Sequence, residues 1–192
     1  MIKLIVGLGN PGRQYEKTRH NAGFLFLDVL GRKFDGQWRL NPTGNAAISE
    51  IFVGADKVYL LKPQTYMNKS GDALVKMAHY YKIMAEEILV IHDELDFDFA
   101  VVRLKKGGGH AGHNGLRDII QKLGSRDFYR LRVGIGRPPA GWKVADYVLS
   151  VLSPDEQAEM ERLAEGFAAE LPDLVSGDMG RVMTKINQNK KQ

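Results

Sequence analysis

Short apolar runs that resemble β-strands alternate along this chain with stretches of helical periodicity, and this alternation is the strongest constraint on the fold. The runs are KLIVGL, AAISEIFV, KVYLLK, EILVIHDEL, AVVRLKK and FYRLRVGIG, at residues 3–8, 46–53, 57–62, 87–95, 100–106 and 128–136. Only the turn residues GAD separate the second run from the third, which predicts an antiparallel hairpin. We therefore expect an α/β fold, with a single domain over residues 1–192 whose twisted mixed β-sheet carries helices on both faces.

Helical periodicity marks the segments between and after these runs. Residues 22–34 and 70–82 each present one apolar face, which predicts burial of Phe26, Leu27, Leu30 and Phe34 in the first segment and of Leu74, Val75, Ala78 and Tyr81 in the second. A short helix over 115–124 should stop at Gly124. Ser153 as N-cap, Pro154 in the first turn and Glu156 in the capping-box position predict a further helix start. The basic end, residues 187–192, is expected to be a frayed tail.

The composition excludes several kinds of chemistry. The 192 residues include no cysteine, so disulfides, thiolate metal sites and cysteine nucleophiles are ruled out. No apolar run approaches the length of a membrane span, and the first residues lack the pattern of a secretory signal, so we expect a cytoplasmic protein. The net charge of +4 fits a polyanionic partner but is also common in proteins that have none.

The first glycines match a nucleotide-binding fingerprint in spacing only. Gly7, Gly9 and Gly12 follow a strand as G-x-G-x-x-G, which in dinucleotide-binding units opens a helix. Here a polar stretch follows, and helical periodicity begins only at Ala22. The carboxylate at about the right distance, Asp28, lies within a helical segment rather than at the end of a second strand. The pattern therefore argues against a nicotinamide cofactor, and we expect these glycines to allow a sharp turn instead.

Polar residues that can do chemistry gather where strand-like runs end, in residues 9–21, 63–71, 91–96 and 107–115. Loops at the strand ends of α/β folds converge on a ligand crevice, so these segments are candidates for one site. Each residue also has a structural interpretation. Asn10 suits a tight turn, Asn68 and Asn114 suit helix caps, and His20 suits the surface at a helix start. His92 suits a strand end, where Asp93 and Glu94 would close a turn.

The glycine-rich segment 107–115 and the nearby basic residues also allow more than one interpretation. His110 and His113 lack the i, i+4 helical spacing of paired zinc ligands, so no metal is expected. The segment is no P-loop, and its G-x-x-G match to an RNA-binding clamp is very short. Five basic residues also stand out, namely Arg103, Lys105, Lys106, Arg132 and Arg137. Their side chains are either solvated individually or gathered in one patch that would attract a nucleic-acid backbone.

Taken together, these segments resemble the bacterial peptidyl-tRNA hydrolase family. GLGNPGRQYEKTRHNAG is similar to the opening signature of that family, KPQTYMNKSG to its second block, HDELD to its third and GGGHAGHNGL to its fourth, in the expected order. The resemblance covers essentially the whole chain. It implies a hydrolase with an α/β fold that cleaves the ester between a peptide, or an N-blocked amino acid, and the 3′ ribose of tRNA. It also implies peptidyl-tRNA as partner, no cofactor, no membrane, no obligate protein partner and a monomer.

The resemblance also assigns site residues by position. His20 matches the catalytic histidine and Asp93 its acidic partner, while Asn10 matches a residue that orders the reacting groups. Substrate-binding positions of the family fall on Tyr15, Met67, Asn68, His113 and Asn114. Recognition of the tRNA phosphate is implied for Lys105 and Arg132, with Arg103 as a further candidate. The segment 138–152 is a candidate rim or lid, in which Trp142 either packs or stacks on a base.

The residue types suit direct attack by water. An ester is more easily hydrolysed than an amide, and the chain has neither a cysteine nor a G-x-S-x-G motif, so His20 is expected to activate water while Asp93 orients its ring. Asparagine amides and backbone N–H groups near Asn114 are candidates for stabilising the oxyanion. The competing hypotheses are a non-catalytic RNA-binding module on the same scaffold and the nicotinamide oxidoreductase suggested by the first glycines.

Overall fold

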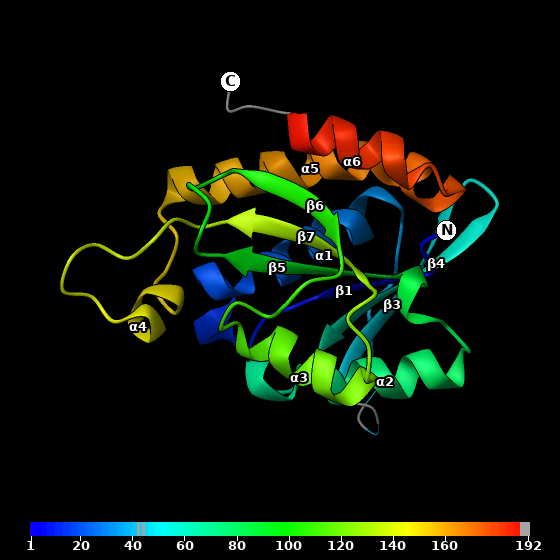
Figure 1. The fold of residues 1–192 in the computed structure, drawn as a ribbon, viewed down its shortest axis with the longest axis horizontal. Helices are drawn as coiled ribbons and strands as arrows, with labels where there is room; N and C mark the ends of the chain where they lie inside the picture. Colours follow the sequence, from blue (N-terminus) through cyan, green and yellow to red (C-terminus); the bar gives the residue numbers. More distant parts are fainter. Residues whose placement is uncertain (42, 44, 189–192) are drawn as a thin grey trace.

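The computed structural model describes residues 1–41, 43 and 45–188, and its centre is a seven-stranded sheet of order β2-β3-β4-β1-β5-β7-β6 (Figure 1). The strands are β1 (Leu4–Gly7), β2 (Arg39–Asn41), β3 (Ala46–Val53), β4 (Asp56–Pro63), β5 (Ile88–Glu94), β6 (Val102–Lys106) and β7 (Tyr129–Gly134). β1 pairs in parallel with β4 and β5, and β5 with β7, whereas β2, β3 and β6 add antiparallel pairs. The expected mixed sheet and its hairpin are therefore confirmed.

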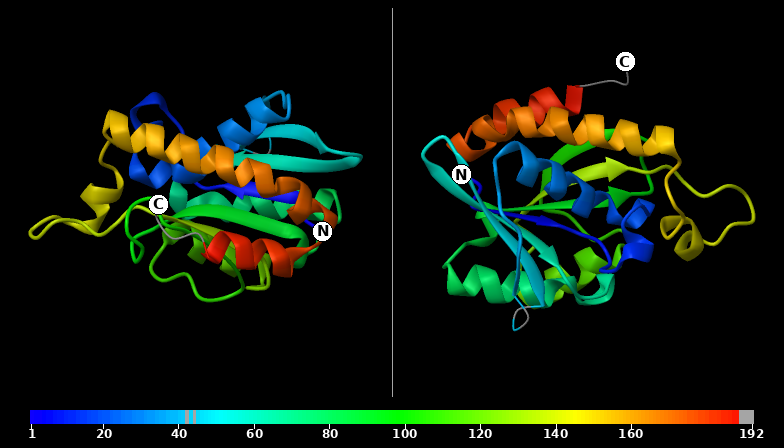
Figure 2. Two further views of the ribbon diagram at one scale, coloured as in Figure 1. Left: turned by 90° about the horizontal axis from the view of Figure 1, so that it is seen from above. Right: turned by 180° about the vertical axis from the view of Figure 1, so that it is seen from behind.

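Helices cover both faces of this sheet, as expected. α1 (Ala22–Lys33) and α5 (Pro154–Ser176) lie over one face, and α2 (Ser70–Tyr80) and α3 (Asn114–Leu123) lie over the other (Figure 1). α6 (Met179–Gln188) runs beside α5 and contacts the edge strand β6, while α4 (Val144–Val148) stands with an extended loop off the main body (Figure 2). β1 is buried on both faces, so the apolar core forms one layer on each side of the sheet.

The close contact between α1 and β1 explains the first glycines. A Cβ added to Gly7 would lie 2.3 Å from the carbonyl oxygen of Gly23, and one added to Gly23 would lie 2.3 Å from the backbone nitrogen of Leu8. The sharp-turn explanation holds only for Gly12, whose φ is 113°. The chain then passes through two short 3₁₀ turns, η1 (Arg13–Tyr15) and η2 (Arg19–Asn21), before α1 begins. No helix opens within the glycines, so the geometry is not that of a dinucleotide motif.

The helix ends were largely predictable. Ser153 Oγ accepts from the Glu156 N–H at 3.2 Å, and Glu156 Oε2 accepts from the Ser153 N–H at 2.8 Å, which confirms the capping box that begins α5. Gly124 ends α3 in the left-handed conformation, with φ 67°. α5 runs on from this start to Ser176, and Gly177 ends it in the left-handed conformation, with φ 99°.

Two expectations about buried and frayed residues were wrong. Tyr81 is 40% exposed and stacks on Tyr59, because α2 ends at Tyr80 and does not carry the next residue round to the core; Met77 fills that face instead. Residues 187 and 188 belong to α6 rather than to a frayed tail. The side chain of Asn187 accepts from the Leu104 N–H at 2.8 Å and donates to the Leu104 carbonyl at 2.9 Å, which pairs it with the free edge of β6. The rest of the expected tail, 189–192, lies outside the described residues.

Within the described part of the chain, no helix is both long and apolar enough to cross a membrane.

Candidate active site

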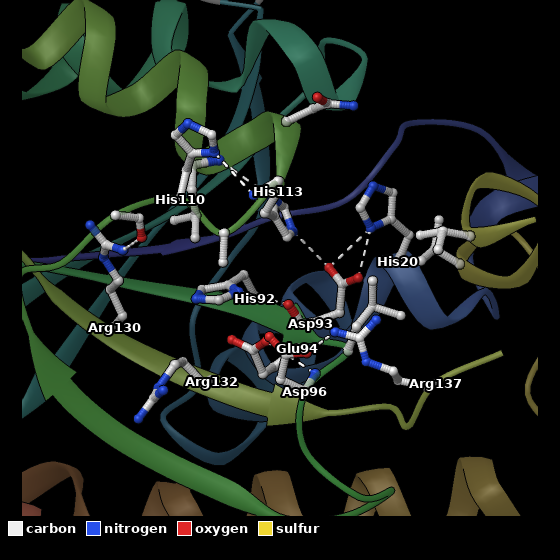
Figure 3. Close-up of a pocket in the computed structure, with 18 of the residues that line it drawn as sticks. His20, His92, Asp93, Glu94, Asp96, His110, His113, Arg130, Arg132 and Arg137 are labelled. Atoms are coloured by element: carbon white, nitrogen blue, oxygen red, sulfur yellow. Dashed lines mark hydrogen bonds and ion pairs between the residues drawn. The ribbon is translucent and has the colours of Figure 1, made fainter.

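A cavity of about 490 Å³ opens where β5 and β7 end and the loops from the sheet edge meet (Figure 3). Figure 3 shows His20 and Asp93 on one side of it and the basic side chains of Arg130 and Arg132 on the other. Lys105 also lines the cavity and is the neighbour of Arg130 across β6 and β7. Parallel neighbours β5 and β7 end at the same edge of the sheet, and the 9–21 loop and the glycine-rich loop close over that edge. The cavity thus occupies the position where α/β folds bind ligands.

The most distinctive feature of the cavity is an ion-pair geometry between His20 and Asp93. Asp93 is at the end of β5, and η2 holds His20 just before α1. His20 Nδ1 lies 2.9 Å from Asp93 Oδ2 and 3.0 Å from Oδ1. Their side chains are 12% and 3% exposed. Because Nδ1 donates to the carboxylate, the lone pair of the ring is on Nε2, which is the nitrogen that a general base would use.

The electrostatics of the pair favour a basic imidazole and an ionised carboxylate. Burial lowers the pKa of His20, but the charge of Asp93 and its hydrogen bond outweigh burial and raise that pKa above its ordinary 6.5. Burial by itself would raise the pKa of Asp93, whereas electrostatic attraction to the imidazoles of His20 and His113, and hydrogen bonds from them, hold it well below its usual range. Asp93 therefore remains an anion that can stabilise an imidazolium on His20.

A second imidazole also contacts this carboxylate. His113 Nε2 lies 2.8 Å from Asp93 Oδ1, and His113 Nδ1 accepts the backbone N–H groups of Gly115 at 3.1 Å and Leu116 at 3.4 Å. His113 is thus the N-cap of α3. The helix-cap interpretation of Asn114 is therefore wrong, since Asn114 is the first helical residue and the imidazole before it satisfies the free N–H groups. Both ring nitrogens of His113 are engaged with the protein.

A third histidine braces the backbone of Asp93. Burial, and next the proximity of His113, lower the pKa of His92 to about 3, so its ring is neutral. His92 Nδ1 donates to the Asp93 carbonyl at 2.7 Å. Its Nε2 is buried and has no hydrogen-bond partner among the described residues. The strand-end role suggested for His92 fits this contact.

A metal was not expected, yet three potential ligands do converge. One ligand atom from each of His20, Asp93 and His113 lies within 4.8 Å of the others. These atoms are instead engaged in hydrogen bonds within the protein. His113 Nδ1 accepts two N–H groups, so the ring proton is on Nε2 and that nitrogen has no lone pair to offer a cation. The cluster is better described as two imidazole donors on one carboxylate.

The asparagines are used in different ways. Asn10 is buried, its Oδ1 accepts the Met67 N–H at 2.8 Å, and its backbone is held by the side chain of Asn21 through two bonds of 2.9 Å. Asn68 is exposed in the 3₁₀ turn η4 (Met67–Lys69) and its side chain caps no helix, so the cap interpretation of Asn68 is also wrong. Asn114 is exposed on the cavity wall.

Not every candidate lines the main cavity. His20, Asp93, Lys105, His113, Asn114 and Arg132 do. Asn10, Tyr15, Met67 and Asn68 lie outside its lining. Met67 nonetheless abuts the start of α3, because a Cβ added to Gly115 would lie 2.7 Å from its Sδ. Asn10 and Tyr15 belong to the loop after β1, and Met67 and Asn68 belong to η4, so these four residues lie outside the hollow that holds the reactive pair.

The basic side of the cavity arises from the register of β6 and β7. Lys105 lies opposite Arg130, and Arg103 lies opposite Arg132. Burial first, and then the charges of Arg132 and Arg130, lower the pKa of Lys105. Three neighbouring cations on one wall form an anion-attracting surface. Arg103 is not in the lining; its Nη1 donates to the Val102 carbonyl at 2.8 Å.

Arg130 was missed by sequence reasoning. It is only 1% exposed, and its guanidinium donates to the carbonyls of Gly108 and Gly109 at 2.5 Å each. It therefore fixes the glycine-rich loop that carries His113 and Asn114. The only available signal was its place in the alternating sequence YRLRVG, and arginine is so seldom buried that such a residue is normally assigned to the surface.

The segment 138–152 forms one rim of the cavity. Val144, Ala145 and Val148 from α4 line it. Arg19 holds the base of this segment, since its guanidinium pairs with Glu156 at 2.9 Å and its Nε donates to Ser150 Oγ at 3.1 Å. Trp142 is 55% exposed and lies edge-on to Tyr147, with ring centroids 6.5 Å apart, so its ring is only partly packed against the protein.

Fold and site together define an α/β enzyme that carries a carboxylate-braced histidine beside a cationic wall. The family model for peptidyl-tRNA hydrolase matches residues 4–192. The chain therefore belongs to the peptidyl-tRNA hydrolase family, as its sequence blocks indicated.

Individual relatives agree with this assignment. A peptidyl-tRNA hydrolase of Dichelobacter nodosus is 52% identical over 168 residues, which cover 88% of this chain and 87% of the relative. One of Methylococcus capsulatus is 48% identical over 187 residues, covering 97% and 100%. The crystal structure of peptidyl-tRNA hydrolase from Acinetobacter baumannii is similar to this fold with a TM-score of 0.93 at 42% identity, covering 98% and 96% of the two chains.

Proposed function

We propose that this protein hydrolyses the ester between a peptide, or an N-blocked amino acid, and the 3′ ribose of tRNA, with water activated by His20. The observation that carries the proposal is the 2.9 Å contact between His20 Nδ1 and Asp93, on the wall of a cavity whose far side is cationic. Membership of the peptidyl-tRNA hydrolase family supports the choice of substrate.

The reaction needs a base for water and a means to stabilise the charge that develops. His20 Nε2 takes a proton from water as the oxygen attacks the acyl carbon, and Asp93 stabilises the imidazolium that forms. Base catalysis of this kind contributes about 10²- to 10⁴-fold. No covalent intermediate is required, because the ester is reactive and the sequence has no cysteine.

Stabilisation of the oxyanion falls to the side chain of Asn114. Backbone N–H groups after Asn114 were also candidates, but those of Gly115 and Leu116 already donate to His113 Nδ1. The Asn114 amide lines the cavity and is exposed, so it is available to the reacting carbonyl or to the attacking water.

The two halves of the substrate have separate sites in this proposal. The peptide lies along the border formed by Asn10, Tyr15, Met67 and Asn68, where the amide of Asn68 is exposed to main-chain groups. The RNA phosphate lies against Lys105 and Arg132. Such a division suits a substrate whose peptide sequence varies while its RNA part is constant. Side-chain amides can form hydrogen bonds with the main-chain groups of any peptide, and cationic side chains bind phosphate whatever the base sequence.

Replacing Lys105 with Ala should weaken tRNA binding and make it less dependent on salt, because one phosphate contact is lost. The slope of log K against log salt should flatten by about 1. Hydrolysis of small N-blocked aminoacyl esters should change less. Lys106→Ala is the matched control, since Lys106 is exposed and does not line the cavity. Equal losses on tRNA and on small esters would refute the phosphate role of Lys105.

A turnover assay separates this proposal from a non-catalytic RNA-binding module. The enzyme should release many N-acetylaminoacyl groups from tRNA per protein molecule, whereas the module would bind tRNA and leave the ester intact. The proposal includes action as a monomer without an obligate protein partner, which gel filtration of the active protein would test. It also includes a cytoplasmic location, which cell fractionation would test. Binding of NAD in equilibrium dialysis would instead support an oxidoreductase.

A further inference from the structure

We propose that His113 is a positioning residue, fixed as its Nε2–H tautomer by the start of α3, which holds Asp93 in place for His20. The inference deepens the proposed function and rests on it. The family resemblance suggested contact with substrate for His113. The structure engages both of its ring nitrogens with the protein instead.

The tautomer follows from what each nitrogen contacts. Gly115 and Leu116 present backbone N–H groups, which can only donate, so His113 Nδ1 must accept and is not protonated. The ring proton is therefore on Nε2, which lies 2.8 Å from Asp93 Oδ1. A carboxylate can only accept, so this contact is a good hydrogen bond with a neutral His113.

The arrangement gives Asp93 donors from two directions. His20 Nδ1 contacts both carboxylate oxygens, and His113 Nε2 contacts Oδ1 only. The side chain of Asp93 is 3% exposed, so water contributes little to its orientation. Without His113, the carboxylate would keep one side-chain donor and could rotate about its terminal bond. The His113 bond therefore fixes the plane in which Asp93 meets the His20 ring.

The hydrogen bond from His113 also weakens the electrostatic effect of the Asp93 carboxylate on His20. A carboxylate that shares its charge with two donors stabilises an imidazolium less than one that has a single donor. Removing the His113 bond should thus raise the pKa of His20. The other titratable groups that face this cluster include His92, whose neutral ring lies edge-on to His113 with centroids 5.1 Å apart. Further along the cavity lie Glu94, Asp96, Lys105, His110, Arg130, Arg132 and Arg137, of which Asp96 and Arg137 form an ion pair with each other.

Two substitutions separate the functions of the imidazole. His113→Asn keeps an acceptor near the place of Nδ1, so it preserves the cap of α3 but is too short to reach Asp93. His113→Gln places an amide N–H near the place of Nε2, so it preserves the bond to Asp93 while weakening the cap. We expect kcat of the Gln variant to exceed that of the Asn variant by about tenfold, as one charge-assisted bond is regained. The acid limb of the pH–rate profile should move to higher pH in the Asn variant only.

The opposite order, with His113→Asn more active than His113→Gln, would mean that the ring serves only as a cap and would overturn the proposal, as would equal losses with unmoved profiles. Thermal unfolding of both variants shows whether a loss comes from stability alone. A readout independent of turnover is the ¹⁵N spectrum of the histidine rings in the wild-type protein. A proton on Nε2 and a bare Nδ1 are expected for His113, and the reverse would refute the tautomer even if the protein were not a hydrolase.

Discussion

Replacing His20 with Ala should reduce the hydrolysis of N-acetylaminoacyl-tRNA at least about 100-fold, which is the scale expected when a general base is lost. Folding should remain nearly intact, because Asp93 keeps its hydrogen bond from His113 and is not left as an unpaired buried charge. Binding of tRNA should also persist, since the basic residues on the opposite wall are unchanged. The measurement is steady-state turnover at a tRNA concentration that saturates both proteins.

His79→Ala is the matched control for that experiment. His79 is an exposed histidine on α2, away from the cavity lining, and its removal should leave turnover at the wild-type level. If the His20 variant turned over substrate as fast as the wild type, His20 would not be the base. If it failed to bind tRNA or unfolded, the loss of activity would not bear on catalysis.

Asp93→Asn should reduce turnover by about 10³-fold or more. An asparagine side chain can present an N–H to His20 Nδ1, which would force the ring proton onto Nε2 and leave no lone pair facing water. The corresponding change in a Ser–His–Asp triad costs about 10⁴-fold for the same reason. Asp98→Asn, at an exposed position in the loop after β5, is the control. Retention of more than a tenth of the wild-type kcat by the Asp93 variant would contradict the role of the carboxylate.

The reactive pair could be predicted because its residues lie in distinctive blocks and follow different elements. TRHN precedes a helix and HDELD ends a strand, and in an α/β fold both positions fall at the same sheet edge. The strands other than β2, and the capping box at Ser153, were predictable from local patterns in the same way. The family resemblance, confirmed by the match over residues 4–192, supplied the roles, which local patterns alone could not.

Features that depend on tertiary contacts could not be predicted. Arg130 looks like a surface cation until the glycine-rich loop is folded over it. His113 rather than Asn114 caps α3, because its imidazole accepts the backbone N–H groups of Gly115 and Leu116. Asparagine is a preferred residue for this position, whereas histidine is not among those usually expected there. β2 is entirely exposed and has no apolar run to mark it. Asn187, expected in a frayed tail, pairs with the edge of β6 through its amide.

The pH dependence of kcat/KM, compared between the wild type and Asp93→Asn from about pH 5 to 8, tests the coupling of base and carboxylate most directly. Hydrolysis needs neutral His20, so wild-type activity should fall as the pH drops through the pKa of His20, which Asp93 holds above 6.5. Without the carboxylate charge, burial prevails and that pKa should fall below 6.5, so the residual activity of the variant should persist to lower pH. An acid limb at the same pH in both proteins would show that Asp93 does not tune the group that activates water.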